Sequence, residues 1–202
     1  MKRWQRKTNK MKLPYKVVAI DLETTGLDKD VASIVELGAV VVNEDLSIAR
    51  EFRSYIKPLD SFRTEKAMEV NGITEEMLAS APTLEEVLMK FDRFSAGVRN
   101  LGAWGTYFDV QFLKAQYKKI DRQYPYDWRD FDLKTVAMWE LGKRDMATMK
   151  GVEACLKKLG LEFIGDAHSA LDDIKNSVRI LQHFCQPVGV ETLKPGVRIL
   201  KK

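Results

Sequence analysis

Hydrophobic and polar positions repeat with two different periods along the chain, and the change of period separates strands from helices. Apolar, mainly β-branched runs divided by short polar turns predict three antiparallel strands, at residues 17–20, 34–42 and 48–56. Apolar residues at helical spacing then predict short helices within 61–78, and longer ones after Thr83 and over 107–119, 133–141, 149–159 and 170–184. Two further short strands are expected at 99–104 and near 128–131.

The resulting order, β-β-β-α-β-α-β-α-α-α, predicts an α/β fold with a mixed five-stranded sheet flanked by helices. The first three strands form an antiparallel meander, because short hairpins close with little loss of loop entropy. The fourth and fifth strands follow helices, so right-handed crossovers place them parallel to the first strand. The carboxyl ends of the first and fourth strands then lie together, where open α/β sheets bind ligands.

Length and charge indicate one domain with basic extensions. The chain has 202 residues and a net charge of +4. We expect a domain over residues 16–186, a basic N-terminal arm at 1–15 and a basic C-terminal tail at 187–202. The first acidic residue is Asp21, so the arm carries only positive charge. Such an arm suits contacts with the phosphates of a polyanion and equally suits a solvated extension.

The sequence contains two cysteines, Cys155 and Cys185, without metal-ligand spacing, which favours free thiols in a reducing compartment. No signal peptide is evident, and no apolar stretch approaches the roughly 20 residues that span a bilayer. We therefore expect a cytoplasmic, soluble protein that does not use a membrane. Nothing in the sequence indicates an obligate protein partner.

The first candidate chemistry lies at the end of the first strand. Asp21 and Glu23 are two residues apart, so on an extended chain their side chains point to the same side. No basic residue occurs between Lys16 and Lys29 to pair with them locally. Two carboxylates on one face need solvent, a cationic partner or a metal ion, and a hard cation such as Mg²⁺ suits them. By itself, an Asp-x-Glu pair is a weak signal.

Two further acids come from other predicted elements. Asp109 lies in the first turn of the helix after the fourth strand. At this position the helix dipole stabilises an acid by about 0.3–1 kcal/mol, which would explain Asp109 without any functional role. Asp173 lies on the inward stripe of the last helix, which has no basic residue of its own. That stripe also contains Ala170, Ser177, Ile180 and Phe184. The polar stripe of Asp172, Asn176, Arg179 and His183 is expected to face solvent.

His168 lies five residues before Asp173 on a glycine-containing loop, and a histidine can accept a proton near neutral pH. Together with carboxylates from three separate elements, it predicts a metal-dependent hydrolase. Two divalent ions, Mg²⁺ or Mn²⁺, roughly 3.5–4 Å apart would stabilise the attacking and leaving oxygens of phosphoryl transfer. The predicted catalytic residues are Asp21, Glu23, Asp109, His168 and Asp173.

Three segments resemble the three motifs of the DEDDh 3′-to-5′ exonucleases, which have a ribonuclease H-like fold. They are Asp21-Leu22-Glu23-Thr24-Thr25-Gly26, Phe108-Asp109-x-x-Phe112-Leu113, and His168 with Asp173. Their order and spacing match over about residues 16–184. The resemblance implies that Asp21, Glu23, Asp109 and Asp173 bind metal, directly or through water, and that His168 is the general base. It also implies that Thr24 and Leu27 hold the terminal nucleotide.

The last motif, which continues from His168 to Asn176, is similar to the branch containing the histone-mRNA 3′ exonuclease and bacterial sporulation-inhibitor proteins. Trp104-Gly105 and residues 158–163 agree with that branch. The interval from Gly105 to Asp109 instead resembles the proofreading exonucleases. The sequence therefore leaves the choice between RNA and DNA open.

We expect an exonuclease that releases nucleoside 5′-monophosphates from single-stranded 3′ ends of RNA or DNA. The strand would cross residues 24–27, and Tyr107 or Phe108 is available to stack on a base, although both also suit a core and the core is favoured for Phe108. One alternative is a nucleic-acid-binding module that has lost activity, and another is a structural α/β domain with incidental acids. All five functional positions are filled, which favours the enzyme.

Overall fold

Five strands form one mixed sheet in the order β3-β2-β1-β4-β5, in a computed structural model that describes residues 12–142 and 151–185. The strands are β1 (Val17–Thr24), β2 (Ile34–Val42), β3 (Ile48–Tyr55), β4 (Leu101–Ala103) and β5 (Phe131–Asp132). The first three form an antiparallel meander, while β4 pairs with β1 and β5 pairs with β4 in parallel. The predicted sheet and strand directions are therefore confirmed.

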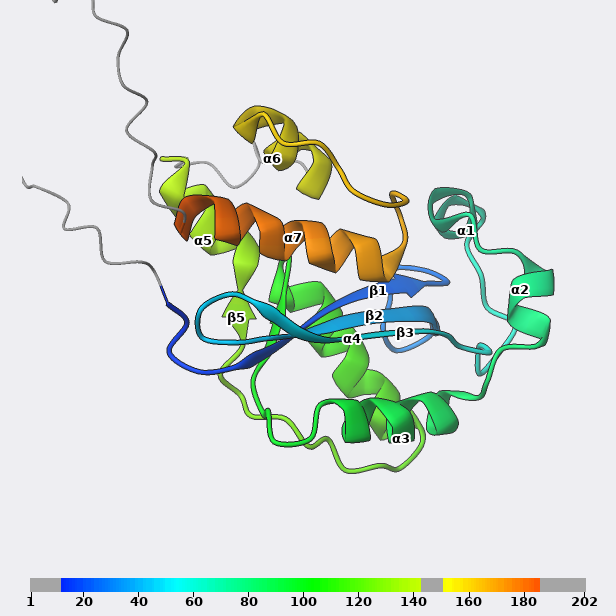
Figure 1. The fold of residues 1–202 in the computed structure, drawn as a ribbon. Helices are drawn as coiled ribbons and strands as arrows, with labels where there is room; N and C mark the ends of the chain where they lie inside the picture. The colour runs from blue at the N-terminus through cyan, green and yellow to red at the C-terminus, as the bar shows by residue number, and fades with distance from the viewer. Residues whose placement is uncertain (1–11, 143–150, 186–202) are drawn as a thin grey trace, which may run out of the picture.

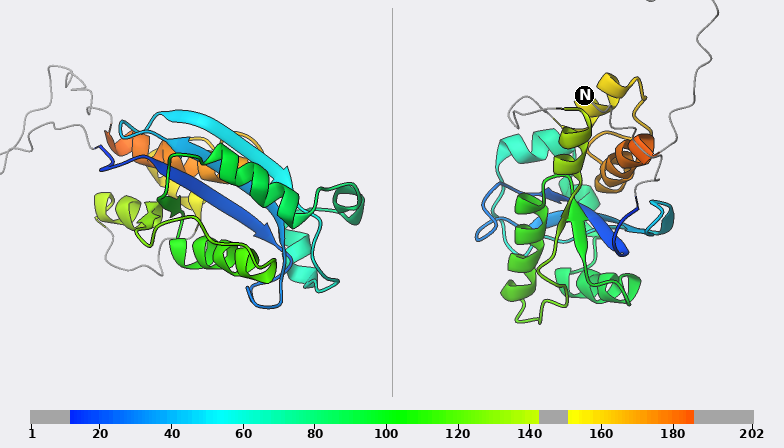
Figure 2. Two further views of the ribbon diagram at one scale, coloured as in Figure 1. Left: turned by 90° about the horizontal axis from the view of Figure 1, so that it is seen from below. Right: turned by 90° about the vertical axis from the view of Figure 1, so that its left-hand side faces the viewer.

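Seven helices accompany the sheet in the described part of the chain. They are α1 (Glu65–Asn71), α2 (Glu75–Ala79), α3 (Leu84–Phe94), α4 (Thr106–Lys119), α5 (Leu133–Glu140), α6 (Val152–Leu159) and α7 (Ala170–Cys185). Helices α3 and α4 lie against one face, and α7 crosses the other face with α5 and α6 beside it (Figure 1). Figure 2 shows the sheet between these two layers. None of these helices is long and apolar enough to cross a membrane.

The alternation of side chains along β1 supplies both layers of the core. Val18, Ile20 and Leu22 belong to the cluster that packs with α3 and α4. Val17 and Ala19 belong to the cluster that packs with α7. Because side chains two residues apart share a face of a strand, Asp21 and Glu23 continue the α7 side.

A glycine on β2 allows α7 to approach the sheet closely. Gly38 is paired with Asp21 on the neighbouring strand. A Cβ atom at this position would lie 2.2 Å from the backbone carbon of Ala170 and the nitrogen of Leu171, well inside van der Waals contact. The missing side chain therefore lets the first turn of α7, which carries Asp173, lie directly on the strand beside β1.

The fifth strand begins later than the sequence predicts. Only Phe131 and Asp132 pair with β4, and Trp128 is 84% exposed. The Asp127 carboxylate accepts a hydrogen bond from the backbone of Trp128 and forms an ion pair with Arg129. These local contacts favour a turn over an extended segment. The expected helix at 149–159 begins at Val152, and its first two predicted residues lie outside the described residues.

Candidate active site

Three elements bring four carboxyl groups together at one end of the sheet. Asp21 and Glu23 lie near the carboxyl end of β1, Asp109 lies in the first turn of α4, and Asp173 lies in the first turn of α7. Burial is the main cause that raises the pKa of Asp21, and repulsion from Asp109, Asp173 and Glu23 raises it further. Glu23, His168 and Asp173 each place one ligand-type atom within 4.8 Å of the others. All five predicted residues therefore share one site.

Burial and mutual repulsion disfavour the charged form of these groups. Burial is the main cause that raises the pKa of Glu23 to about 8, with further contributions from neighbouring acids. Burial also raises the pKa of Asp109 to about 7 and that of Asp173 to about 6, the latter against an opposing effect of His168. Within the part of the chain that the structure describes, none of the four forms an ion pair with lysine or arginine.

This donor set fits divalent metal ions. The four groups offer only carboxylate oxygens, which are the ligands that hard cations prefer. A cation among them would remove the repulsion that their raised pKa values express, because bound ions dominate the local charge of such sites. The side chains that would hold metal are Asp21, Glu23, Asp109 and Asp173.

The position of Asp109 is set by the short connection between β4 and α4. The helix begins directly after Gly105, whose φ of 98° lies in the region that favours glycine. Asp109 is only 6% exposed, and the backbone N–H of Leu22 stabilises its carboxylate. This contact ties the acid on α4 to the strand that carries Asp21 and Glu23.

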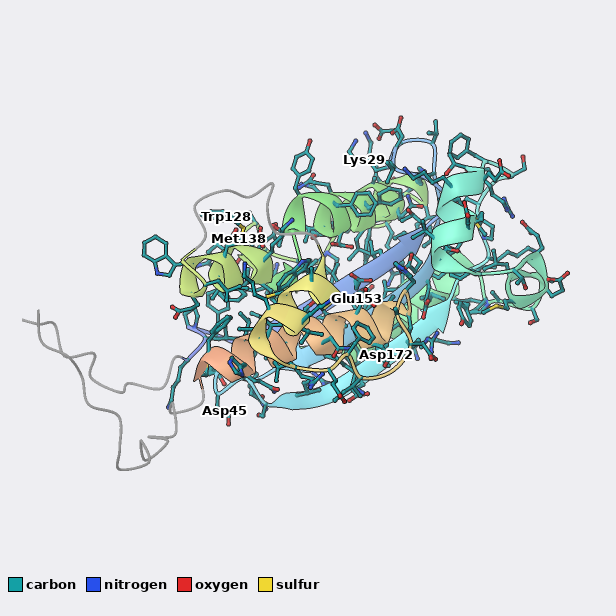
Figure 3. The ribbon with its side chains drawn as sticks, turned by 90° about the horizontal axis from the view of Figure 1, so that it is seen from above. Lys29, Asp45, Trp128, Met138, Glu153 and Asp172 are labelled. Atoms are coloured by element: carbon teal, nitrogen blue, oxygen red, sulfur yellow. The ribbon has the colours of Figure 1, made fainter. Side chains whose placement is uncertain are left out.

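The loop before α7 presents His168 to solvent in a left-handed backbone conformation, with φ of 64°. Its backbone N–H donates to Asp173 Oδ2 at 3.0 Å, and that of Asp166 donates to Asp172 Oδ2 at 3.1 Å. Figure 3 shows Asp172 near the start of α7. The first turn of α7 thus shapes the loop that carries the histidine.

Asn176 contradicts the prediction that its stripe faces solvent, because this side chain is completely buried. Its Nδ2 donates to the carbonyls of Ile164 and Asp172, both at 2.8 Å, and its Oδ1 accepts from the N–H of Ile164 at 3.2 Å. The loop before α7 folds back over this part of the helix, whereas His183, farther along, is exposed as predicted. Asn176 therefore anchors the loop, and helical periodicity alone gave no sign of it.

An ion pair between a buried carboxylate and an exposed arginine was also missed. Glu36 on β2 lies opposite Glu23 and is 1% exposed. It accepts a hydrogen bond from Arg53 Nε on β3, and the backbone amide of Ala170 also stabilises its carboxylate. Glu36 therefore links the sheet to the beginning of α7. The only sequence signal was a single acid within a continuous apolar strand.

Two of the residues predicted to hold substrate, Thr24 and Leu27, line a groove beside Glu23, whereas Tyr107 lies outside it. Thr24 is buried, and its hydroxyl donates to the carbonyl of Gly26 at 2.7 Å, which closes the turn after β1. Leu27 and Tyr107 are 85% and 89% exposed. Phe108 packs against the core, with its ring centroid 5.2 Å from that of Phe112. The groove, about 550 Å³ in volume, has a largely apolar lining that includes Leu22, Leu27, Phe62, Val70 and Phe108, and we call it the apolar groove.

Comparison with known proteins places this site in a family. The model of the exonuclease family of the ribonuclease T type matches residues 18–181, which include all three motifs. The chain belongs to the DEDDh 3′-to-5′ exonucleases. The family resemblance predicted from the motifs is therefore confirmed. DEDDh exonucleases depend on metal ions, in agreement with the donor set of this site.

Two curated relatives of this DEDDh chain are DNA polymerase III proteins. The chain is 32% identical over 171 residues to the PolC-type polymerase of Thermotoga petrophila, an alignment that covers 84% of this chain and only 12% of that polymerase. It is 31% identical over 160 residues to the epsilon subunit of Treponema pallidum, covering 78% of this chain and 70% of that subunit.

Two solved exonuclease structures share the fold. The nuclease domain of 3′hExo, described as a DEDDh family member bound to rAMP, has a TM-score of 0.71 at 24% identity, covering 87% of this chain and 94% of that one. Exonuclease I of Escherichia coli, in a zinc-bound complex with single-stranded DNA, also has a TM-score of 0.71, at 16% identity, covering 84% of this chain and 40% of that one.

Proposed function

We propose that this chain hydrolyses the 3′-terminal phosphodiester bond of single-stranded RNA or DNA and releases nucleoside 5′-monophosphates. The observation that carries this proposal is the convergence of Asp21, Glu23, Asp109, Asp173 and His168 on one site. A structural domain with incidental acids has no reason to bring together four mutually repelling carboxyl groups, one buried and three half-buried. A binding module that has lost activity has no reason to keep the complete set.

The carboxylates are proposed to hold two divalent ions, Mg²⁺ or Mn²⁺. When bound, such ions stabilise the attacking and leaving oxygens and lower the pKa of a bound water. His168 takes the proton from the attacking water as general base, and its exposed position beside Asp173 suits this role. The hydrogen bond from the backbone N–H of His168 to Asp173 keeps the imidazole at the site.

The apolar groove is proposed to hold the terminal nucleotide. Its walls include Leu27 from the turn after β1 and Val70 from α1, which offer contact to a base and a sugar. Thr24 holds the shape of that turn. Proteins of the same fold are described with single-stranded DNA and with a histone-mRNA stem-loop, which supports including both DNA and RNA in the proposed substrate class.

The catalytic domain is proposed to be residues 16–186, with basic segments at 1–15 and 187–202. Leu13 is buried and its N–H donates to the carbonyl of Glu44 at 2.8 Å, so a trimmed chain must keep it. A chain of residues 12–186 is expected to retain cleavage of short substrates. Loss of activity on trimming would contradict this division.

A gel assay tests the proposed reaction. RNA and DNA strands of equal sequence, labelled at the 5′ end, are incubated with Mn²⁺ or with EDTA, using wild type and Asp21→Ala. The proposal predicts a ladder that shortens from the 3′ end, requires metal and is absent with the variant. Intact substrates together with a retarded band on a native gel would instead identify a binding module.

A further inference from the structure

The apolar groove continues into two further grooves that follow helix α4. A middle groove of about 490 Å³ shares Leu27 and Phe108 with it and adds Tyr107. A third groove, of about 600 Å³, shares Lys29 and Gln111 with the middle one. We call it the basic groove, and its lining also includes Lys114, Lys118, Arg122, Asp30, Asp121 and Tyr124. A continuous surface depression therefore leads from the carboxylates along α4.

Hydrogen bonds between α4 and the loop between β1 and β2 hold one wall of the basic groove in place. The carbonyl of Ala32, in the loop between β1 and β2, accepts hydrogen bonds from Gln116 Nε2 at 3.3 Å and Lys119 Nζ at 2.8 Å. Gln116 is completely buried, so α4 holds this loop from within the core. Figure 3 shows Lys29 on the same loop, at the side where α4 lies.

Two cations of the basic groove are available to a ligand. Lys29 pairs with Asp30, and Arg122 pairs with Asp92, so their charges are compensated. Lys114 and Lys118 are exposed and form no ion pair with a described residue. The Lys114 ammonium lies 5.8 Å from the ring of Tyr124, so an aromatic face accompanies the charge. Lysine and aromatic side chains together suit the phosphates and bases of a single strand.

The two sides of the site differ in a way that fits an exonuclease. A single terminal nucleotide lies on one side of the scissile phosphate, and the remaining strand lies on the other. On the α1 side there is the apolar groove, of a size for one nucleotide, while the α4 side continues past the exposed Tyr107 to the two lysines. The extended, basic side therefore suits the remainder of the strand.

We propose that the basic groove binds the phosphates of the single strand on the 5′ side of the scissile bond, through Lys114 and Lys118. This inference rests on the proposed exonuclease function. About 16 Å separate residues 107 and 118 along an α-helix, so the groove lies beyond the terminal nucleotides and acts only on longer substrates. Its effect is tighter binding of long strands, with the chemical step unchanged.

The test compares Lys114→Gln/Lys118→Gln with Lys57→Gln/Lys90→Gln, which removes the same charge from exposed positions that do not line the grooves. Initial removal of one nucleotide is measured in Mn²⁺ for a single-stranded 12-mer, and hydrolysis of the p-nitrophenyl ester of thymidine 5′-monophosphate reports the active site alone. We expect the groove variant to lower kcat/KM for the 12-mer roughly tenfold at 50 mM salt and to leave the ester unchanged. The salt slope of log kcat/KM should fall by about 1.4, because each phosphate contact contributes about 0.7 for single strands.

Equal effects of the two double variants on the 12-mer, or an equal loss on the ester, would overturn the assignment of this groove. Lys114→Arg/Lys118→Arg should retain the activity of wild type on the 12-mer, since it keeps the charge. If wild type cleaves neither substrate, the proposed function itself fails. If wild type cleaves both and the groove variant matches it, only the groove inference fails.

Discussion

The two halves of the active site are held in place by different forces. Asp21 and Asp109 are carried by β1 and α4, whose neighbouring residues belong to the main core, and Asp109 is tied to the backbone of Leu22. Asp173 and His168 depend on polar contacts, in which α7 side chains bind the backbone of the preceding loop. We call these the core half and the loop half. Substitutions in the core half should therefore remove catalytic groups without moving the backbone. In the loop half, loss of a polar contact should also displace His168.

The largest effect is expected in the core half, from Asp109→Asn. The amide oxygen can still accept from Leu22, so the fold remains, while one metal-ligand charge is lost. We expect kcat to fall by about 10⁴-fold or more, since the metal site supplies several kcal/mol of transition-state stabilisation. Thermal unfolding in EDTA should be unchanged or shifted upward, because repulsion with Asp21 decreases. Near-normal cleavage by this variant would remove Asp109 from the mechanism.

In the loop half, His168→Asn removes the proposed base and keeps a residue that tolerates a left-handed backbone. The expected loss in kcat is about 10²- to 10⁴-fold, the usual contribution of a general base. Binding of a labelled single strand in Ca²⁺ should remain the same. A loss of binding equal to the loss of rate would assign His168 to substrate contact instead of proton transfer.

Asn176→Ala tests whether polar contacts position the loop half. Its removal leaves the N–H and carbonyl of Ile164 without their partner, which should lower the free energy of unfolding by about 1–3 kcal/mol. It should also reduce kcat by about 10- to 100-fold through His168, as for other supporting residues around metal sites. Glu162→Ala, which truncates an exposed side chain of the same loop, is the control. Equal melting temperatures and rates for both variants would show that the loop needs no anchor.

A smaller effect concerns pH in the metal-free protein. The folded-state pKa values of Glu23, Asp109 and Asp173, about 8, 7 and 6, exceed their ordinary values near 4. The folded state therefore binds more protons, so this contribution to stability is complete below about pH 4 and is lost as pH rises through 6–8. In EDTA, melting temperature should fall by a few degrees from pH 5.5 to 8.5, less so in Asp109→Asn. An identical fall in both proteins would contradict this origin.

Sequence periodicity was sufficient where a feature depends on neighbouring residues. The meander, the shared side of Asp21 and Glu23 and the inward position of Asp173 follow from strand and helix periods. Periodicity was insufficient where a segment distant in the sequence determines whether a residue is buried. Asn176 has the spacing of a solvent-facing residue but is covered by the loop it binds, and Glu36 is understood only through Arg53 and α7.

The most direct test of the account is a calorimetric titration of metal-free protein with Mn²⁺, for wild type and Asp109→Asn. Four crowded carboxyl groups from three elements should bind two Mn²⁺ ions per wild-type chain, and the variant should lose at least one of them or bind both far more weakly. Saturable binding that is the same in both proteins, or no saturable binding to wild type, would contradict the claim that these carboxyl groups form a metal site.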